Sequence, residues 1–323
     1  MIGKSEVMMQ LAQRVRAAAR VAGSILVTGE TGSGKELVAR AVHQHSERCT
    51  RRFVAVDCGA VPEELIESEL FGFKRGAFTT AVADKTGLFE EANGGTLFLD
   101  EIANTSRRFQ AKLLRALQER QIRRLGDTIS RPVDIRVIAA TNRDLRGLVQ
   151  RGDFREDLFY RINVFAINVP PLRDRIDDVP LLADAILNGR KQISADALSK
   201  LQLYDFPGNV RELENILESA TYTAPGETIE ESDITLSANA VAGFDDVVHV
   251  ENFWESVARP YADRQITRTC VENVVRRGLQ QVNGSYTQLV RLFNLPDSDY
   301  KRFMDFLRRH RCNVDYRQYR QKS

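Results

Sequence analysis

The sequence predicts an α/β domain built on a mainly parallel sheet, followed by helical segments. Short apolar runs alternate with segments of helical periodicity over about the first 170 residues. A glycine-rich segment follows the first apolar run, and two adjacent acids end a later one. Alternating strands and helices are typical of a parallel sheet covered by helices on both faces.

The glycine-rich segment, residues 29–36, predicts a phosphate-binding loop. It lies between the apolar run 25–27 and an amphipathic stretch, so that backbone N–H groups and a helix N-terminus can surround phosphate oxygens. Lys35 would reach the outer phosphates, whereas Glu36 stands where the full pattern has a magnesium-binding Ser or Thr. An ordinary strand–turn–helix is the alternative. The predicted nucleotide contacts are Gly29, Glu30, Thr31, Gly32, Ser33, Gly34, Lys35 and Glu36.

Length and composition indicate a soluble, cytoplasmic protein with no membrane role. The 323 residues are enough for two or three domains, and the longest apolar runs fall far short of the roughly 20 residues of a membrane span. Residues 1–10 do not read as a secretory signal. The four cysteines form no C-x-x-C pair, which favours free or buried thiols over a metal site or a disulfide.

Periodicity predicts the order of the elements. Met8, Leu11 and Val15 lie at helical spacing, Pro62 sits in the first turn of a later helix, and Phe109 and Leu113 share one helical face. The expected elements are helix 8–22, strand 24–28, helix 36–45, strand 53–57, helix 62–70, strand 96–99, helix 106–118 and strand 135–140.

Polar side chains follow two of the predicted strands. Asp100 and Glu101 end the strand that starts at Thr96, in a Walker B pattern in which one acid holds magnesium and the other polarises the attacking water. A helix-capping acidic strand end is the alternative. Asn142 follows the strand 135–140 and is placed to sense a γ-phosphate.

Three arginines are candidates for contacts with phosphate. Arg155 and Arg161 flank an acidic, aromatic helix, where they are either solvated surface residues or fingers that stabilise transition-state charge on a neighbouring subunit's nucleotide. Arg211 lies in the first turn of a helix that Pro207-Gly208-Asn209 starts, against the helix dipole, so it needs an anionic partner. A nucleotide phosphate and a nearby carboxylate both satisfy that need.

Residues 71–81 are aromatic and glycine-bearing, with no strand or helix period. Apolar side chains on a loop often mark a contact surface. Packing of these rings onto the core is the alternative, and composition alone gives the two interpretations equal weight. The candidate contact residues are Phe78, Thr79 and Thr80.

The C-terminal segment, 251–323, predicts a helical DNA-binding domain after a linker over 237–250. It carries a charge balance of +6, against −4 for the rest of the chain. Helices over 285–294 and 298–309, joined by a tight turn, fit a helix-turn-helix, although any small helical bundle has similar spacing. The candidate DNA contacts are Ser298, Lys301, Arg302, Arg308 and Arg309.

Residues 29–36, 67–79, 94–101, 154–161 and 207–215 together resemble the AAA+ domain of the bacterial enhancer-binding proteins, the sigma-54-dependent transcription activators. The resemblance covers about residues 2–236, and the tail is more loosely similar to a Fis-type helix-turn-helix. It implies an AAA+ P-loop NTPase fold over 1–170, an α-helical lid subdomain over 171–236 and a C-terminal all-helical helix-turn-helix domain.

The resemblance also implies the activity and the roles of the site residues. It implies a ring, commonly a hexamer, that hydrolyses ATP with Mg²⁺ and remodels the closed complex of sigma-54 RNA polymerase at enhancer DNA. Lys35 then binds phosphates, Asp100 holds magnesium and Glu101 activates water. Arg155 and Arg161 act in trans, Arg211 is the second sensor, and the loop around Thr79 touches sigma-54. Glu36 matches the family, which also places Glu after the lysine.

Two departures from the family pattern stand out. Thr80 replaces the second glycine of Gly-Ala-Phe-Thr-Gly-Ala, and Asp57 stands where the family often has an asparagine that bonds the Walker B glutamate. Thr80 motivates an alternative function, a DNA-binding AAA+ regulator that binds ATP without driving sigma-54; a chaperone-like remodeller is disfavoured by the predicted helix-turn-helix. No receiver domain precedes Met1, so either the chain is part of a longer protein or a regulatory protein controls it in trans.

Overall fold

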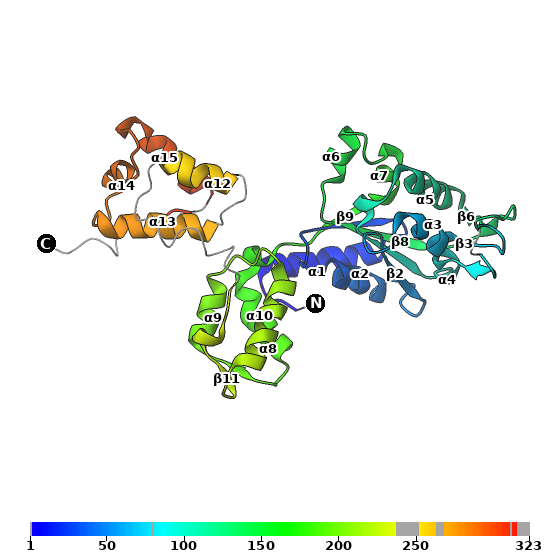
Figure 1. The fold of residues 1–323 in the computed structure, drawn as a ribbon, viewed down its shortest axis with the longest axis horizontal. Coiled ribbons are helices and arrows are strands. Elements are labelled where there is room, and N and C mark those ends of the chain that lie inside the picture. The colour runs from blue at the N-terminus through cyan, green and yellow to red at the C-terminus, as the bar shows by residue number, and fades with distance from the viewer. Residues whose placement is uncertain (1, 79–80, 237–251, 263–267, 311, 315–323) are drawn as a thin grey trace. The chain divides into compact units, whose positions relative to one another are not determined.

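The computed structural model describes residues 2–78, 81–236, 252–262, 268–310 and 312–314 (Figure 1). The chain divides into two compact units. The first contains residues 1–182 with 208–211, and the second contains residues 183–207 with 212–323.

A five-stranded parallel sheet organises the first unit, in the order β2-β5-β8-β1-β9. Because all five strands run the same way, their carboxyl ends share one edge, where polar residues of neighbouring strands meet. The predicted strands at 24–28, 53–57, 96–99 and 135–140 are all present. The strand bounds are β1 (Ile25–Thr28), β2 (Phe53–Asp57), β5 (Thr96–Asp100), β8 (Arg136–Thr141) and β9 (Phe165–Asn168).

Helices cover both faces of this sheet. Side chains alternate along each strand, so Leu97 and Leu99 pack with one set of helices and Phe98 packs with the other. α1 and α2 lie against one face, and α5 and α7 against the other (Figure 1). The helices of this unit are α1 (Glu6–Ala19), α2 (Lys35–Gln44), α3 (Glu63–Phe71), α4 (Leu88–Glu91), α5 (Arg107–Glu119), α6 (Leu145–Gln150) and α7 (Glu156–Ile162).

Helix starts follow local sequence signals. Ser5 and Ser106 cap α1 and α5, with side-chain oxygens that accept hydrogen bonds from Met8 N and Phe109 N. The predicted apolar face of α1 is buried, including Leu11 and Val15. Both helices therefore form as the spacing predicts, with ends shifted by one to three residues.

The prediction that residues 71–81 lack regular structure is wrong at its start. Phe71 ends α3, and β3 (Gly72–Phe73) pairs antiparallel with β4 (Lys85–Thr86). Gly72 has φ +74°, and a Cβ there would lie 2.4 Å from Lys85 O, so only glycine fits this close approach. Backbone pairing of two-residue strands leaves no side-chain period to detect. A second hairpin joins β6 (Gln121–Ile122) to β7 (Arg131–Pro132).

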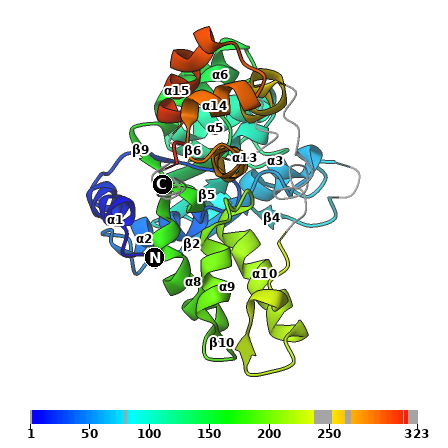
Figure 2. The same ribbon diagram turned by 90° about the vertical axis from the view of Figure 1, so that its left-hand side faces the viewer.

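The second unit is mainly helical. A short parallel pair, β10 (Gln192–Ile193) and β11 (Thr228–Ile229), lies at the end of a group of helices that lie side by side in both views (Figures 1 and 2). These helices are α8 (Val179–Leu187), which continues from the 3₁₀ segment η2 (Leu172–Asp178), α9 (Ala195–Gln202) and α10 (Asn209–Thr223), followed by the turn η3 (Glu231–Asp233).

The C-terminal helices enclose a core of their own, centred on Phe253, whose ring contacts those of Phe293 and Phe303. Phe303 and Leu307 of the last helix are buried, whereas Tyr300 is 39% exposed. Tyr300 is the first residue of that helix. The elements are η4 (Trp254–Ala258, a π-helical turn), α12 (Arg259–Ala262), α13 (Arg268–Gln281), α14 (Tyr286–Leu292), η5 (Asp297–Asp299) and α15 (Tyr300–Arg309).

Candidate nucleotide-binding site

The glycine-rich segment forms a tight turn between β1 and α2, as predicted. Gly32 has φ +74° and Gly34, the N-cap of α2, has φ +99°, which are conformations that glycine adopts without strain. A Cβ on Gly32 would lie 2.2 Å from Gly208 O, so the backbone segment 208–211 packs directly on the loop. The turn therefore directs backbone N–H groups toward a common centre at the start of α2.

Lys35 and Asp100 define the charge at this centre. Lys35 is 7% exposed, and its Nζ donates to the main-chain oxygen of Glu30 at 3.2 Å. Burial lowers the pKa of Lys35, against the pull of Asp100 and Glu101, and burial raises the pKa of Asp100, against the pull of Lys35. Both groups give up hydration in the folded chain, so a ligand that brings phosphate and a divalent cation would compensate both.

Glu101 follows β5 in a left-handed conformation, with φ +52°. Its Oε2 accepts a hydrogen bond of 2.6 Å from Asn104 Nδ2. Asp57 Oδ1, by contrast, accepts hydrogen bonds from the backbone N–H groups of Gly59 at 2.8 Å and Ala60 at 3.2 Å. Asp57 and Glu101 therefore each have a hydrogen-bond partner of their own.

Asn142 lies at the end of β8, beside the loop. Its Nδ2 donates to Thr31 Oγ1 at 2.9 Å. The predicted residue therefore meets the phosphate-binding loop directly. Glu36, the residue in the place of Ser or Thr, points away into solvent and pairs with Arg40 at 2.7 Å.

Arg211 lies in the first turn of α10, as predicted, and is close enough to Lys35 to lower the pKa of that lysine, although less than burial does. The segment that carries it is anchored by Asn209, which sequence reasoning missed. Asn209 is fully buried; its Nδ2 donates to Thr31 O at 3.1 Å and Glu30 Oε2 at 3.2 Å, and its Oδ1 accepts from Leu172 N at 2.8 Å.

Two further arginines, both in η2, bind the phosphate-binding loop. Sequence reasoning missed these as well. Arg173 forms two hydrogen bonds, of 2.7 and 2.6 Å, with the carboxylate of Glu30. Arg175, which is 5% exposed, donates to Ser33 O at 3.0 Å. The only sequence signal is their position just after the Pro170-Pro171 stretch that ends the sheet, which does not distinguish them from solvated arginines.

The two candidate finger arginines lie at the ends of α7. Arg155 precedes the helix and pairs with Asp157, with its Nη2 2.7 Å from Asp157 Oδ2. Arg161 Nη2 donates to Leu117 O at 2.6 Å. Each has a partner within its own chain.

The candidate contact loop emerges between β3 and β4. Phe78 is 39% exposed, and its ring meets that of Phe73 edge-on, with 4.8 Å between centroids. Thr79 and Thr80 lie outside the described residues.

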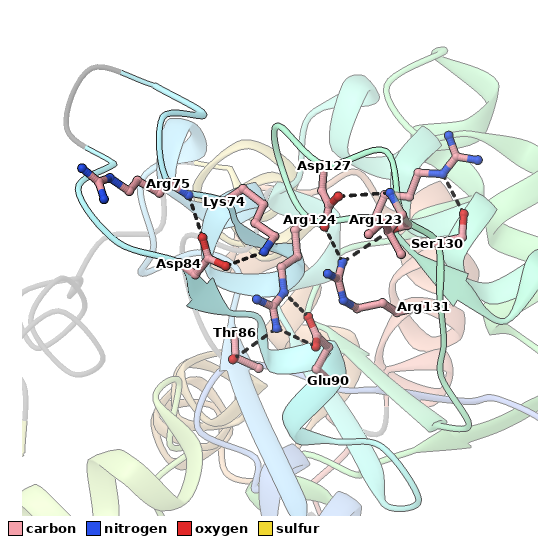
Figure 3. Close-up of polar contacts among 11 residues, drawn as sticks. Lys74, Arg75, Asp84, Thr86, Glu90, Arg123, Arg124, Asp127, Ser130 and Arg131 are labelled. Atoms are coloured by element: carbon pink, nitrogen blue, oxygen red, sulfur yellow. Dashed lines mark hydrogen bonds and ion pairs between the residues drawn. The ribbon is translucent and has the colours of Figure 1, made fainter.

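Ion pairs fix the base of this loop to its neighbours (Figure 3). Lys74 Nζ lies 2.6 Å from Asp84 Oδ2, on the other side of the loop, and Arg124 makes a two-bond contact with Glu90. Leu125, in the β6–β7 connection, exchanges backbone hydrogen bonds with Gly72 and Lys74. The β6–β7 connection therefore packs on the loop like a third strand.

Four of the five candidate DNA contacts line one groove: Ser298, Lys301, Arg302 and Arg309. The guanidinium of Arg302 lies 4.2 Å from the centre of the Trp254 ring, and Trp254 Nε1 donates to Asp299 Oδ2 at 2.8 Å. Arg308 is exposed but is not part of this groove.

The sheet order, the glycine-rich turn after β1 and the acids that end β5 define a P-loop NTPase fold of the AAA+ class. Comparisons with known proteins agree. The sigma-54 interaction domain family matches residues 1–168, and the AAA+ ATPase lid domain matches residues 173–242. The chain belongs to the family of sigma-54 interaction domain proteins.

Curated relatives support this assignment. The chain is 44% identical over 273 residues to the response regulator protein PilR of Pseudomonas aeruginosa, covering 80% of this chain and 61% of PilR. It is 47% identical over 243 residues to a Nif-specific regulatory protein of Azotobacter vinelandii, covering 73% and 47%. The chain thus spans about half the length of these relatives.

A solved structure has the same fold. The crystal structure of NtrX from Brucella abortus superimposes with a TM-score of 0.72 at 31% identity, over 95% of this chain and 69% of that chain. In the described part of the chain, none of the helices has the length and apolar character that crossing a membrane requires.

Proposed function

We propose that this protein is an ATP-hydrolysing, DNA-binding activator that remodels sigma-54 RNA polymerase. The observation that carries the proposal is the convergence of Lys35, Asp100 and Glu101 on the edge of the sheet that the phosphate-binding loop closes. The relatives named above are regulators, and others include an activator described as sigma-54-dependent from Pseudomonas putida. They give no support to the alternative of a regulator that binds ATP without driving sigma-54.

ATP is the proposed ligand of the loop. NtrX, the related structure, was crystallised with ATP and with ADP. The backbone of residues 29–34 would cradle the phosphates, Lys35 would neutralise the outer ones, and Arg211 would contact them from the start of α10. Asp100, whose carboxylate is partly desolvated beside Lys35, has the hard oxygen donors that Mg²⁺ prefers and would hold the ion. The ion would neutralise charge on the phosphates.

Hydrolysis is assigned to Glu101. Its carboxylate would accept a proton from the attacking water, while Asn142, at the end of β8, would contact the outer phosphate. Replacing Glu101 by Gln should leave ATP binding within about twofold and lower turnover by about 10²- to 10⁴-fold. Replacing Lys35 by Ala should weaken binding itself. Native turnover in Glu101→Gln would remove the assigned role.

Assembly into a ring, commonly a hexamer, is part of the proposal. Arg155 and Arg161 would then leave Asp157 and Leu117 O to face the ATP of a neighbouring subunit. Mixing Arg161→Ala with Lys35→Ala chains should restore part of the turnover, because some interfaces then combine a native loop with a native finger. No restored turnover at any mixing ratio would contradict action in trans.

The loop that carries Phe78, Thr79 and Thr80 is the proposed sigma-54 contact. Phe78 is an exposed aromatic ring, which is typical of a contact surface. The Lys74–Asp84 ion pair holds the base of the loop that carries it. We expect the nucleotide state to move this loop. Replacing Phe78 by Ala should abolish open-complex formation and leave ATP turnover within about twofold, because Phe78 is not among the residues assigned to nucleotide binding or proton transfer.

DNA binding is assigned to Ser298, Lys301, Arg302, Arg308 and Arg309, in a helix-turn-helix formed by α14 and α15. Removing one side chain that binds a phosphate should lower the salt slope of DNA binding by about one. We propose the domain limits 1–170 for the α/β subdomain, 171–236 for the lid, 237–250 for the linker and 251–323 for the DNA-binding domain. Unchanged salt dependence in Arg309→Ala would contradict the placement of α15.

A further inference from the structure

The carboxylate of Glu101 accepts a hydrogen bond from the side-chain amide of Asn104, three residues further along the chain. Glu101 has a left-handed backbone conformation, so the chain turns sharply into the 3₁₀ segment η1 (Ile102–Asn104). Asn104 N donates to Glu101 O at 2.9 Å, which closes the turn, and Asn104 Nδ2 donates to Glu101 Oε2 at 2.6 Å. Backbone and side chain of Asn104 therefore both bind Glu101.

Asp57 lies close by without taking this role. A Cβ placed on Gly59 would lie 3.2 Å from Glu101 Oε2, 3.3 Å from Asn104 Nδ2 and 3.3 Å from Asp57 Oδ1, so all three groups surround one point. Two backbone N–H groups already bind Asp57 Oδ1. A carboxylate cannot donate to another carboxylate unless it is protonated, whereas an amide can.

The orientation of the Asn104 amide follows from its two neighbours. Glu101, when ionised, only accepts hydrogen bonds, and Arg143 only donates them. The Nδ2 group therefore faces Glu101, and Oδ1 faces Arg143, whose Nη1 lies 3.4 Å away. If the amide were reversed, its oxygen would face the Glu101 carboxylate and its NH₂ group would face the Arg143 guanidinium, so neither hydrogen bond could form.

Arg143 connects this contact to the sheet edge. It directly follows Asn142, which bonds to Thr31 of the phosphate-binding loop, and its backbone N–H donates to Thr141 Oγ1 at 3.0 Å. A movement of the end of β8 would therefore be transmitted to Thr31 through Asn142 and to Asn104 through Arg143.

We propose that Asn104 is the positioning residue of Glu101, and that Arg143 links it to the γ-phosphate-sensing end of β8. This proposal rests on the proposed ATPase function. Asn104 supplies, from the same loop as the catalytic acid, the amide that the family often supplies from the position of Asp57. It holds the Glu101 carboxylate in one direction until the bound nucleotide shifts β8.

The test is a set of substitutions read by ATP affinity, kcat and the pH dependence of kcat. Asn104 is exposed, so its variants are expected to fold. Asn104→Ala should lower kcat by up to about 10²-fold, because misplacing a catalytic group by about 1 Å can cost that much, with ATP affinity within about twofold. Asn104→Asp sets a second carboxylate against Glu101, and the acid limb of the pH–rate profile should move to higher pH.

Asp57→Asn is the matched control. Its side chain keeps an oxygen acceptor for Gly59 and Ala60, and it removes a negative charge that lies close to Glu101. The acid limb should therefore stay in place or move to lower pH, opposite to Asn104→Asp. Arg143→Met should lower kcat less than Asn104→Ala does.

Native kcat and a native pH profile in both Asn104 variants, with Glu101→Gln inactive, would overturn the role of Asn104 and leave the ATPase intact. An upward shift of the acid limb in Asp57→Asn would also overturn it, by making Asp57 the partner of Glu101. Full turnover in Glu101→Gln would instead show that the proposed hydrolysis itself is wrong.

Discussion

The side-chain amide of Asn209 donates to the main-chain oxygen of Thr31 at 3.1 Å and so joins the first residue of α10 to the phosphate-binding loop. Asn209 is fully buried and has φ +57°. Its three side-chain hydrogen bonds reach the loop and the start of η2. The geometry of the loop therefore depends on a residue about 180 positions away in the sequence.

Removing these hydrogen bonds should destabilise the protein. Asn209→Gly tolerates the positive φ but leaves Leu172 N without a partner, so the free energy of unfolding should fall by about 1–3 kcal/mol. Asn209→Ala should lose about 1 kcal/mol more, because a Cβ disfavours the left-handed conformation. Urea unfolding measures both. Asn188, also at positive φ but exposed, is the control, and Asn188→Gly should cost less than about 0.5 kcal/mol. Equal losses at both sites would contradict the anchoring role.

A methyl group on Gly126 should disturb the contact loop. Its Cβ would lie 2.8 Å from Ala77 Cβ, so the loop that carries Phe78 must move. Gly126→Ala should lower sigma-54 open-complex formation with ATP affinity unchanged. Gly152→Ala is the matched control, since Gly152 has a similar φ of +77° and open space around it; there only a backbone cost of about 1–2 kcal/mol is expected. Equal open-complex rates in the two variants would refute the coupling.

The Arg124–Glu90 pair should stabilise the loop base in a pH-dependent way (Figure 3). The hydrogen bonds from Arg124 lower the pKa of Glu90 below its usual value. A lowered carboxyl pKa contributes stability above the unfolded-state pKa of about 4.3, and this stability is lost as pH falls through the folded-state pKa.

Glu90→Gln should therefore cost about 1–3 kcal/mol of unfolding free energy at pH 7, and the difference from the native chain should shrink below about pH 4. Thermal unfolding across this range measures it. Asp153→Asn, in a pair with Arg151 whose side chains are 62% and 61% exposed, should change little at any pH. A pH-independent cost in Glu90→Gln would contradict the ionic role of the pair.

Cysteine labelling should distinguish the thiols. Burial, chiefly, raises the pKa of Cys58 to about 12, and the pKa of Cys312 likewise to about 12. Because the thiolate is the reactive form, both should react with iodoacetamide at pH 8 about 10³-fold more slowly than exposed Cys49. Peptide mapping by mass spectrometry separates the sites, and labelling in denaturant is the control. Equal rates for Cys58 and Cys49 in the folded protein would contradict the burial of Cys58.

Local patterns were enough to predict the sheet and to place several of the candidate site residues at the ends of its strands. Glycines at 29, 32 and 34, the lysine after them and the acids that end β5 are contiguous signals, and the structure places Lys35, Asp100 and Asn142 around one loop. The polar residues that follow each strand can be predicted to lie near one another, because parallel strands have their carboxyl ends at the same edge of the sheet.

Contacts between segments that are distant in the sequence could not be predicted from it. Asn209 and Arg175 act through main-chain oxygens of the loop, and any residue type supplies such an oxygen. Likewise, the partner of Glu101 depends on a left-handed turn that moves Asn104 into reach, while Asp57 turns to its own backbone. These outcomes depend on backbone geometry, which periodicity does not encode.

The most direct test of the proposed function is isomerisation of a sigma-54 closed promoter complex by the purified chain, measured beside its ATP turnover. We predict that ATP drives promoter opening, that Glu101→Gln blocks it, and that Phe78→Ala turns over ATP without opening the promoter. If the native chain turns over ATP while the promoter stays closed, the activator function proposed here is contradicted.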